Sequence, residues 1–399
     1  MRRGKAAVGL ALLQLPQCHA LLSLLPHSPG SGFLRPCFGY LAEWAANMTD
    51  HATASIAPET SLAPAMVRPL VAQGVARLRQ DAWFYYAVLG YTVLGLIFLV
   101  AVGDPGGTAH ASYTMPAVKG FLLMMPLVAL SFDAIAVVVR FDARRSLAFR
   151  RTFSAGRLAS LLAGMIMMTG IAVFQGTFTT IKSSLPAMFG GFPYDRLHAG
   201  IDAALHLGTD PWRLLHAVAG NGVVRLIAEI NYGEVWFTVC FGALFFVVTS
   251  PKAEAVRKRY LLMFMFVWIV LGNLMAGAFL SAGPAFHGNV TGDHTRFAEL
   301  LAFLAQSPLD ASVIVSQRYL WLIHENHLQG LGGGISAFPS VHVALVTMNA
   351  LFVIERSRFW GILAFGYVAF VLASSVYLGW HYAIDGYASI VLVTAAHFG

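Results

Sequence analysis

Residues 261–280 read LLMFMFVWIVLGNLMAGAFL, a run of twenty residues without a charged side chain. An α-helix of about twenty apolar residues is long enough to cross the roughly 30 Å hydrocarbon core of a bilayer. Similar apolar segments occur at seven further places, which are 83–103, 117–139, 158–180, 234–250, 338–354, 360–380 and 384–398. The sequence therefore predicts an all-α fold, a polytopic membrane helical bundle with about eight transmembrane helices.

The composition agrees with this interpretation. Hydrophobic residues make up 57% of the 399 residues and charged residues only 11%, so the chain has more apolar surface than one soluble core can bury. The net charge of +7 does not indicate nucleic-acid binding, because the basic residues are not interleaved with aromatic residues on a polar domain. Cys18, Cys37 and Cys240 form neither a disulfide framework nor a CxxC metal motif.

The chain divides into three predicted parts. Residues 1–80 form an N-terminal segment, signal-like or disordered; translation from Met48 or Met66 is an alternative to the printed start. Residues 81–157 hold accessory transmembrane helices, and residues 158–399 hold the membrane domain that carries the chemistry.

Basic residues orient the apolar segments. The loop RFDARRSLAFRRTFSAGR at 140–157 carries six arginines, PKAEAVRKRY at 251–260 carries four basic residues, and ERSR begins at 355. Cytoplasmic loops are enriched in Lys and Arg, so these loops are predicted to lie in the cytoplasm. The loops at 181–233 and 282–337 then face the opposite, extracytoplasmic side.

Two histidine-containing stretches lie on that extracytoplasmic side. The first, at 332–345, reads GGGISAFPSVHVAL and contains His342; the second, at 374–388, reads SSVYLGWHYAIDGYA and contains His381 and Asp385. His381 and Asp385 are four residues apart, so on a helix they share a face and the carboxylate can accept a hydrogen bond from one imidazole nitrogen. The other nitrogen is then free to act as a nucleophile, and the second histidine can serve as acid and base.

Each motif alone also has a structural interpretation. A single histidine at a membrane interface is commonly a snorkelling or hydrogen-bonded residue, and Pro-Ser before a helix is an ordinary cap. The pair favours catalysis, because ionisable groups near lipid are costly and these two clusters match in topology and chemistry.

The stretches FPSVHVA and YLGWHYAIDGYA resemble the second and third signature motifs of the type 2 phosphatidic acid phosphatase superfamily. They resemble in particular its inositolphosphotransferase branch, which includes inositol phosphorylceramide synthase. The resemblance implies a six-helix membrane core and a phosphohistidine mechanism that needs no metal and no cofactor. His381 would attack phosphorus and Asp385 would orient it, while His342 would protonate the leaving alkoxide and then deprotonate the acceptor hydroxyl.

The sequence departs from the phosphatase pattern in its cations. Ser375 stands where that pattern has an arginine, and the upstream lysine with its distant Arg-Pro is missing. Other cations must therefore balance the negative charge of the phosphate, and Lys182 and Arg318 are the candidates on the extracytoplasmic side. The alternative for Lys182 is interfacial snorkelling, and the alternative for Arg318 is a solvated loop face. Ser340 and Tyr377, which lie within the two motifs, are further candidates for substrate binding.

Two further stretches resemble the transferase branch. They are 182–216, which includes the pair Tyr194-Asp195 together with Asp202 and Asp210, and FLSAGPAFHG at 279–288. Polar side chains there could read a head group, but capping of helices is the favoured interpretation of Asp202 and Asp210. His324 and His327 are a conceivable metal pair, yet without HExxH spacing or cysteines no metal site is predicted.

The sequence predicts a phosphotransferase that moves a phospho-head group, such as phosphoinositol, from a phospholipid donor to a lipid-alcohol acceptor such as ceramide. A lipid phosphate phosphatase using water as acceptor is the alternative, and a non-catalytic carrier or flippase is disfavoured because no span carries a chain of buried charges. The predicted location is the bacterial inner membrane, with the active site on the extracytoplasmic face. The oligomeric state is not indicated.

Overall fold

The computed structural model describes residues 62–399 except 104–106, 141–143 and 309–311. All regular elements of this described part are helical, which confirms the predicted all-α class. Of the segment predicted at 1–80, only the part from Leu62 is described, and there it forms a helix. Cys18, Cys37 and Met48 lie outside the described residues.

The N-terminal helices pack on one long helix, α7 (Ala155–Phe189). Gly95 permits this contact, because a Cβ there would lie 2.6 Å from the Thr177 side chain of α7. The predicted boundary at 158 falls inside α7. The helices before it are α2 (Leu62–Gln80), α3 (Ala82–Val102), α4 (His110–Pro116), the π-helix η1 (Ala117–Met124), α5 (Met125–Arg140) and α6 (Arg145–Thr152).

The membrane core is built around α17 (Val341–Ile354), which contacts α18 (Arg358–Tyr377) and α19 (Ala383–Phe398). Two further helical stretches, each interrupted by π-helical turns, complete it with α7. The first contains α10 (Gly222–Ile230), η2 (Asn231–Val235) and α11 (Trp236–Thr249); the second contains η3 (Pro251–Ala253), α12 (Glu254–Phe266), η4 (Val267–Met275) and α13 (Ala276–Ala278).

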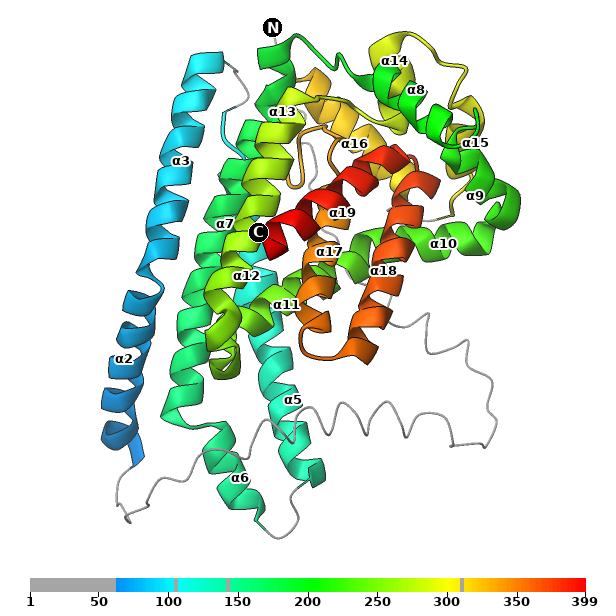
Figure 1. Ribbon diagram of the computed structural model, residues 1–399. Helices are drawn as coiled ribbons and strands as arrows, with labels where there is room; N and C mark the ends of the chain where they lie inside the picture. Colours follow the sequence, from blue (N-terminus) through cyan, green and yellow to red (C-terminus); the bar gives the residue numbers. More distant parts are fainter. Residues whose placement is uncertain (1–61, 104–106, 141–143, 309–311) are drawn as a thin grey trace, which may run out of the picture. The chain divides into compact units, whose positions relative to one another are not determined.

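Short helices connect the core helices at one end. They are α8 (Asp195–Leu205), α9 (Pro211–Ala219), η5 (Pro284–Phe286), α14 (His287–Thr291), α15 (Ala298–Leu304) and α16 (Val313–Glu325). In Figure 1, α8, α14 and α15 lie at the top, whereas the arginine-rich α6 lies at the opposite end. The loops predicted to be extracytoplasmic are therefore gathered away from a loop predicted to be cytoplasmic.

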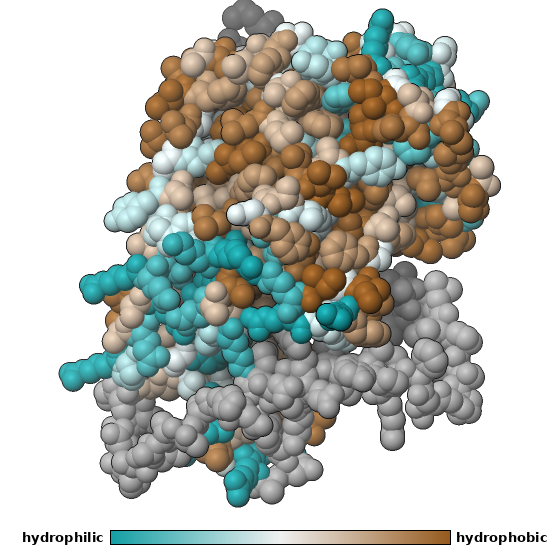
Figure 2. Space-filling model, in the orientation of Figure 1, coloured by the Kyte–Doolittle hydropathy of each residue, from teal (hydrophilic) through white to brown (hydrophobic). Residues whose placement is uncertain are grey.

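Among the described residues, six helical stretches are long and apolar enough to cross a membrane, by length and composition: 82–102, 110–139, 145–189, 222–249, 251–278 and 358–377. The other two predicted spans are the shorter apolar helices α17, with 14 residues, and α19, with 16. Figure 2 shows a mainly apolar face above a band of hydrophilic side chains. The chain is thus a helical membrane bundle, and its two shortest apolar core helices carry the histidine motifs.

Candidate active site

His342 lies in the first turn of α17, between two aromatic rings from the neighbouring helical stretch. Its imidazole stacks on Tyr232 with a centroid distance of 4.4 Å and an interplanar angle of 13°. On another side it contacts Trp236, at a centroid distance of 4.0 Å. The Trp236 Nε1–H also donates a hydrogen bond of 3.0 Å to the His342 carbonyl. These contacts fix both the backbone and the ring of His342.

The π-helical turn η2 precedes Trp236 and contains Tyr232. Tyr232 and Trp236 are four residues apart, so in a helix both project toward the same side. Single π-helical turns inside α-helices occur frequently at functional sites. Neither residue is predicted from the sequence, because an aromatic pair at this spacing in an apolar helix is not distinguishable from ordinary core packing.

His381 lies between α18 and α19 and is paired with Asp385 in the first turn of α19. The distance between His381 Nδ1 and Asp385 Oδ2 is 3.3 Å, as the spacing of the two residues predicts. The same Oδ2 accepts the backbone N–H of Tyr382 at 3.0 Å, while Oδ1 is buried without a hydrogen-bond partner in the described structure. With Nδ1 directed at the carboxylate, Nε2 is the nitrogen available for chemistry.

The surroundings of His381 keep its imidazole neutral. Burial lowers the pKa of His381 to about 3, and the positive charge of Lys182 acts in the same direction. A hydrogen bond with the Ala337 backbone opposes these two effects without cancelling them. A nucleophilic imidazole must be unprotonated, so this environment favours the reactive form at neutral pH.

The imidazole rings of His342 and His381 lie close together. Their ring centroids are 6.4 Å apart and their planes are inclined by 57°, so the rings do not stack. A nucleophile and a general acid must flank the same reacting group, and catalytic contacts that are long without substrate tighten when substrate binds. The predicted convergence of the two motifs is therefore present in the fold.

The stretch at 281–284, Ser-Ala-Gly-Pro, connects the two motifs. The Ser281 carbonyl accepts the N–H of Ala337, which precedes the first motif, at 2.7 Å. On its other side, Gly283 packs so closely that a Cβ there would lie 2.6 Å from the carbonyl oxygen of Trp380. Gly283 also has a φ of +93°, so a side chain at this position would be strained and obstructed.

Asp195, at the start of α8, accepts hydrogen bonds from the stretch at 281–284. Its carboxylate accepts the N–H groups of Ala282 at 2.7 Å and Gly283 at 2.9 Å, and the hydroxyl of Tyr382 at 2.9 Å. Burial raises the pKa of Asp195 to about 6, although these three hydrogen bonds act in the opposite direction. Asp195 thus positions the residue next to His381 and does not point toward a head group.

The two remaining acidic residues of this loop have different roles. Asp202 caps α19, because its carboxylate accepts the N–H groups of Ala383 at 3.0 Å and Ile384 at 3.1 Å, as the capping interpretation predicts. Asp210 occupies the N-cap position of α9 but makes no side-chain cap. Its carboxylate instead pairs with Arg296 at 2.6 Å, so the capping prediction for Asp210 is wrong.

Lys182 lies in the last turns of α7, with Nζ 5.9 Å from the centroid of the Phe178 ring. The positive charge of Lys182 lowers the pKa of His381, so it acts electrostatically on the predicted nucleophile. No carboxylate pairs with Lys182 in the described part of the chain. It is available to meet the negative charge of a bound phosphate.

The glycine-rich segment before the first motif packs directly on Lys182. A Cβ at Gly334 would lie 2.8 Å from the backbone nitrogen of Ser183 and 2.9 Å from Cγ of Lys182. The φ of Gly334 is +83°, a region that residues with a side chain rarely adopt. This glycine lets the loop and the end of α7 meet beside the histidines.

The other predicted binding residues are placed differently. Arg318 is exposed on α16, and no contact in the described structure joins it to the histidines. The Tyr377 hydroxyl donates to the carbonyl of Ala219 at 2.9 Å, which assigns Tyr377 to the support of the fold. Ser340 caps α17 by accepting the Val343 N–H at 3.4 Å, and the backbone N–H of Ser340 donates to the Asp385 carbonyl at 3.1 Å.

His324 and His327 line a pocket beside the end of α7. Among the described residues, no group of three or more His, Cys, Asp and Glu side chains is arranged to hold a metal ion.

Comparison with known proteins gives one match. A sequence profile of the PAP2 superfamily matches residues 198–399, just over half of the chain, and this range contains both histidines and Asp385. A search of curated proteins found no match, and a search of solved structures found none either.

Proposed function

This chain belongs to the PAP2 superfamily, whose membership indicates a phosphatase or phosphotransferase acting on lipids, and we propose that it is a phosphotransferase. In this proposal it moves phosphoinositol from a glycerophospholipid to a lipid alcohol such as ceramide, at the extracytoplasmic face of a bacterial inner membrane. The inositolphosphotransferase branch is the part of the superfamily that its motifs resemble.

The charge of the site is the observation that carries the choice of a transferase. In the described structure, Lys182 is the cation whose charge acts on His381. The place where the phosphatase pattern has an arginine holds Ser375, which is buried and donates its hydroxyl to the Leu372 carbonyl at 2.7 Å. A phosphomonoester carries about −1.5 to −2 charges at neutral pH, whereas a phosphodiester carries one negative charge. A single lysine is the better match for a phosphodiester donor.

The first half of the proposed reaction forms a covalent intermediate. His381 Nε2 attacks phosphorus, and the bond from phosphorus to the diacylglycerol oxygen breaks. In this proposal His342 takes up a proton when the phosphate anion binds beside it, because a nearby negative charge favours the protonated imidazole. His342 then gives this proton to the diacylglycerol oxygen, so diacylglycerol leaves as a neutral alcohol. Asp385 stabilises the positive charge that develops on His381, and Lys182 stabilises the negative charge on the phosphoryl oxygens.

The second half returns the site to its starting state. His342 accepts the proton of the acceptor hydroxyl, whose oxygen attacks phosphorus while the phosphorus–nitrogen bond to His381 breaks. Water is the competing nucleophile. His381 is only 7% exposed, and this burial supports a lipid hydroxyl as the acceptor, because closed sites protect reactive intermediates from hydrolysis.

Product analysis with purified protein tests the proposal. Diacylglycerol release from phosphatidylinositol should depend on added ceramide, and a lipid that carries phosphoinositol should accumulate at the same rate. His381→Ala and His342→Ala should abolish turnover, and Asp385→Asn should lower it by a factor on the order of 10³–10⁴. His397→Ala is the matched control, because His397 lies at the far end of α19 and contacts Glu355.

Two results would contradict this function. Release of free inositol phosphate without any acceptor, or hydrolysis of phosphatidic acid at a comparable rate, would make the enzyme a phosphatase. Near-normal turnover in the His381→Ala variant would exclude the phosphohistidine mechanism for either activity.

A further inference from the structure

The short helix α8 has the reverse of the usual arrangement of polar and apolar side chains. Three of its polar residues, Asp195, His198 and Asp202, are buried against the rest of the protein. Its outward face carries three large apolar side chains that are at least 40% exposed, those of Leu197, Ile201 and Leu205. A surface helix in water turns its polar face outward. The outward face of α8 is therefore not suited to water.

A leucine in an unusual backbone conformation follows this face. Leu207 has a φ of +59°, and the N–H of the next residue, Gly208, donates to the Ala203 carbonyl at 2.8 Å. A helix end closed in this way usually has glycine or asparagine at the position with positive φ. Here the position holds a leucine whose side chain is 99% exposed. A bulky apolar side chain that protrudes from a strained position, next to a row of others, indicates contact with an apolar partner.

Exposed apolar side chains continue on α9, where Leu214 is 48% and Val218 is 90% exposed. Val223 and Ile227 are exposed on the following helix, α10, which begins the stretch 222–249 that is long and apolar enough to cross a membrane. Figure 2 shows a mainly apolar surface on the side where Figure 1 places α9 and α10. We call the exposed apolar side chains of α8, α9 and the turn between them the apolar ridge, which consists of Leu197, Ile201, Leu205, Leu207, Leu214 and Val218. The ridge leads directly into a membrane-spanning stretch.

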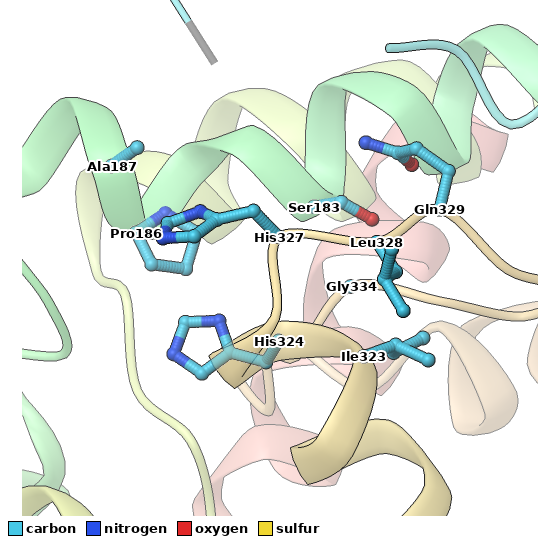
Figure 3. A pocket seen from close by; sticks show the side chains of 9 residues that line it. All are labelled: Ser183, Pro186, Ala187, Ile323, His324, His327, Leu328, Gln329 and Gly334. Atoms are coloured by element: carbon cyan, nitrogen blue, oxygen red, sulfur yellow. The ribbon is translucent and has the colours of Figure 1, made fainter. Parts of the chain in front are cut away.

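Few charged groups accompany the apolar ridge. Within residues 197–224, all of which are described, the only exposed charged side chain is that of Arg213, which pairs with Glu299. A long arginine side chain can reach from an apolar surface to water. The pocket that His324 and His327 line contains no residue of the ridge (Figure 3), and the ridge side chains protrude instead of enclosing a site. An extended apolar phase fits such a surface better than a single small molecule, which needs a concave site.

The inner sides of α8 and α9 hold the surroundings of His381. The carboxylates of α8 accept N–H groups on both sides of this histidine, as described above. In α9, His216 Nε2 lies 3.1 Å from the Tyr377 carbonyl, and the Tyr377 hydroxyl donates to the Ala219 carbonyl at 2.9 Å. Tyr377 is the last residue of α18, and His381 follows four residues later. The apolar ridge is therefore at the same end of the bundle as the two histidines.

We propose that α8 and α9 are embedded in the membrane leaflet nearest the two histidines, where the apolar ridge contacts the acyl chains of bilayer lipids. The continuity of the ridge with α10 supports lipid as the partner, because α10 belongs to a membrane-spanning stretch. In this position the end of α18 is at the level of the lipid head groups, so a lipid substrate reaches His381 without leaving the membrane. The inference goes beyond the proposed function and holds for a transferase and a phosphatase alike.

Fluorescence quenching of the full-length protein in lipid nanodiscs tests the inference without requiring turnover. A bimane label is attached to Leu207→Cys or Val218→Cys after the three native cysteines are removed. We expect lipids with a nitroxide on the acyl chain to quench both labels, at a depth of about 5–10 Å below the head-group boundary, and aqueous iodide to have little effect. Asn289→Cys is the matched control, because Asn289 is exposed on α14, which packs against α8. Its label should be quenched by iodide and not by the nitroxide lipids.

Three results would overturn the assignment. Quenching of either ridge label by iodide in place of lipid would put that label in water. Protection from both quenchers would indicate that protein covers the ridge, such as a second copy of the chain. Equal lipid quenching of the Asn289→Cys label would show that the ridge does not differ from the rest of this end of the bundle. Leu214→Cys is a third ridge position if either labelled variant has an altered size-exclusion profile, so two positions always carry the test.

Discussion

Replacing Gly334 with alanine should lower activity by displacing Lys182. The new Cβ would lie 2.9 Å from Lys182 Cγ and 2.8 Å from the Ser183 nitrogen, whereas ordinary van der Waals contact begins at 3.4 Å. The loop and the end of α7 must therefore separate by roughly half an ångström. A misplacement of about 1 Å in a catalytic group can cost on the order of 100-fold in rate. Half of that displacement corresponds to about a tenfold fall in kcat/KM.

Gly332→Ala provides a matched control in the same segment. Gly332 also has a positive φ, +66°, but no atom lies within 4 Å of the position that its Cβ would occupy. Both substitutions carry the same kind of backbone strain, about 1–2 kcal/mol. Only Gly334→Ala adds the contact with Lys182, so the difference between the two variants isolates the displacement.

The assay is transfer from phosphatidylinositol to ceramide by purified variants, with thermal unfolding measured in parallel. We expect the two alanine variants to have similar melting temperatures. Gly332→Ala should have near-normal activity, and Gly334→Ala should have about tenfold lower kcat/KM. Lys182→Met should lower kcat/KM further, by about 10²–10³, the range seen when one group that stabilises a developing charge is removed. Equal activity in the two alanine variants, or full activity in Lys182→Met, would refute the role of Lys182.

Two further predictions concern pH and topology. Burial raises the pKa of Asp195 to about 6. Activity should therefore fall as the pH is lowered through about 6, because a proton on the carboxyl disrupts its three hydrogen bonds. The contribution of Asp195 to the free energy of unfolding changes in the opposite direction and increases as the pH falls, because a raised pKa makes protonation favour the folded state. An acid limb that persists unchanged in Asp195→Asn would assign this limb to another group. For topology, Asn326→Cys should react with an impermeant thiol reagent outside intact cells and Ser146→Cys should not, both being exposed positions; the reverse labelling would place the site in the cytoplasm.

Much of the fold could be predicted because hydropathy alone defines membrane helices. The eight apolar segments all correspond to helices, and the four-residue spacing of His381 and Asp385 correctly predicts their contact. The meeting of His342 with His381 also followed from topology, because both motifs were assigned to one side of the membrane. These features depend on local sequence and on the direction of each span.

The surroundings of the histidines could not be predicted, because they depend on contacts between distant segments. Asp195 receives N–H groups from residues 87 and 88 positions away, and no local pattern distinguishes this role from a helix cap. Tyr377 looked like a binding residue because it lies within a motif, yet its hydroxyl reaches a carbonyl 158 positions away. Asp210 was expected to cap α9 and instead pairs with Arg296, 86 positions away.

The helix dipole of α19 does not replace the missing arginines of the phosphatase pattern. A free helix N-terminus can bind an anion through its backbone N–H groups, and α19 begins beside His381. However, the N–H groups of Ala383 and Ile384 already donate to Asp202, and that of Tyr382 donates to Asp385. These carboxylates fix the start of α19 and so the orientation of His381, but they occupy the donors that a phosphate would use. The helix terminus therefore positions the nucleophile, and the proposed charge stabilisation depends on Lys182.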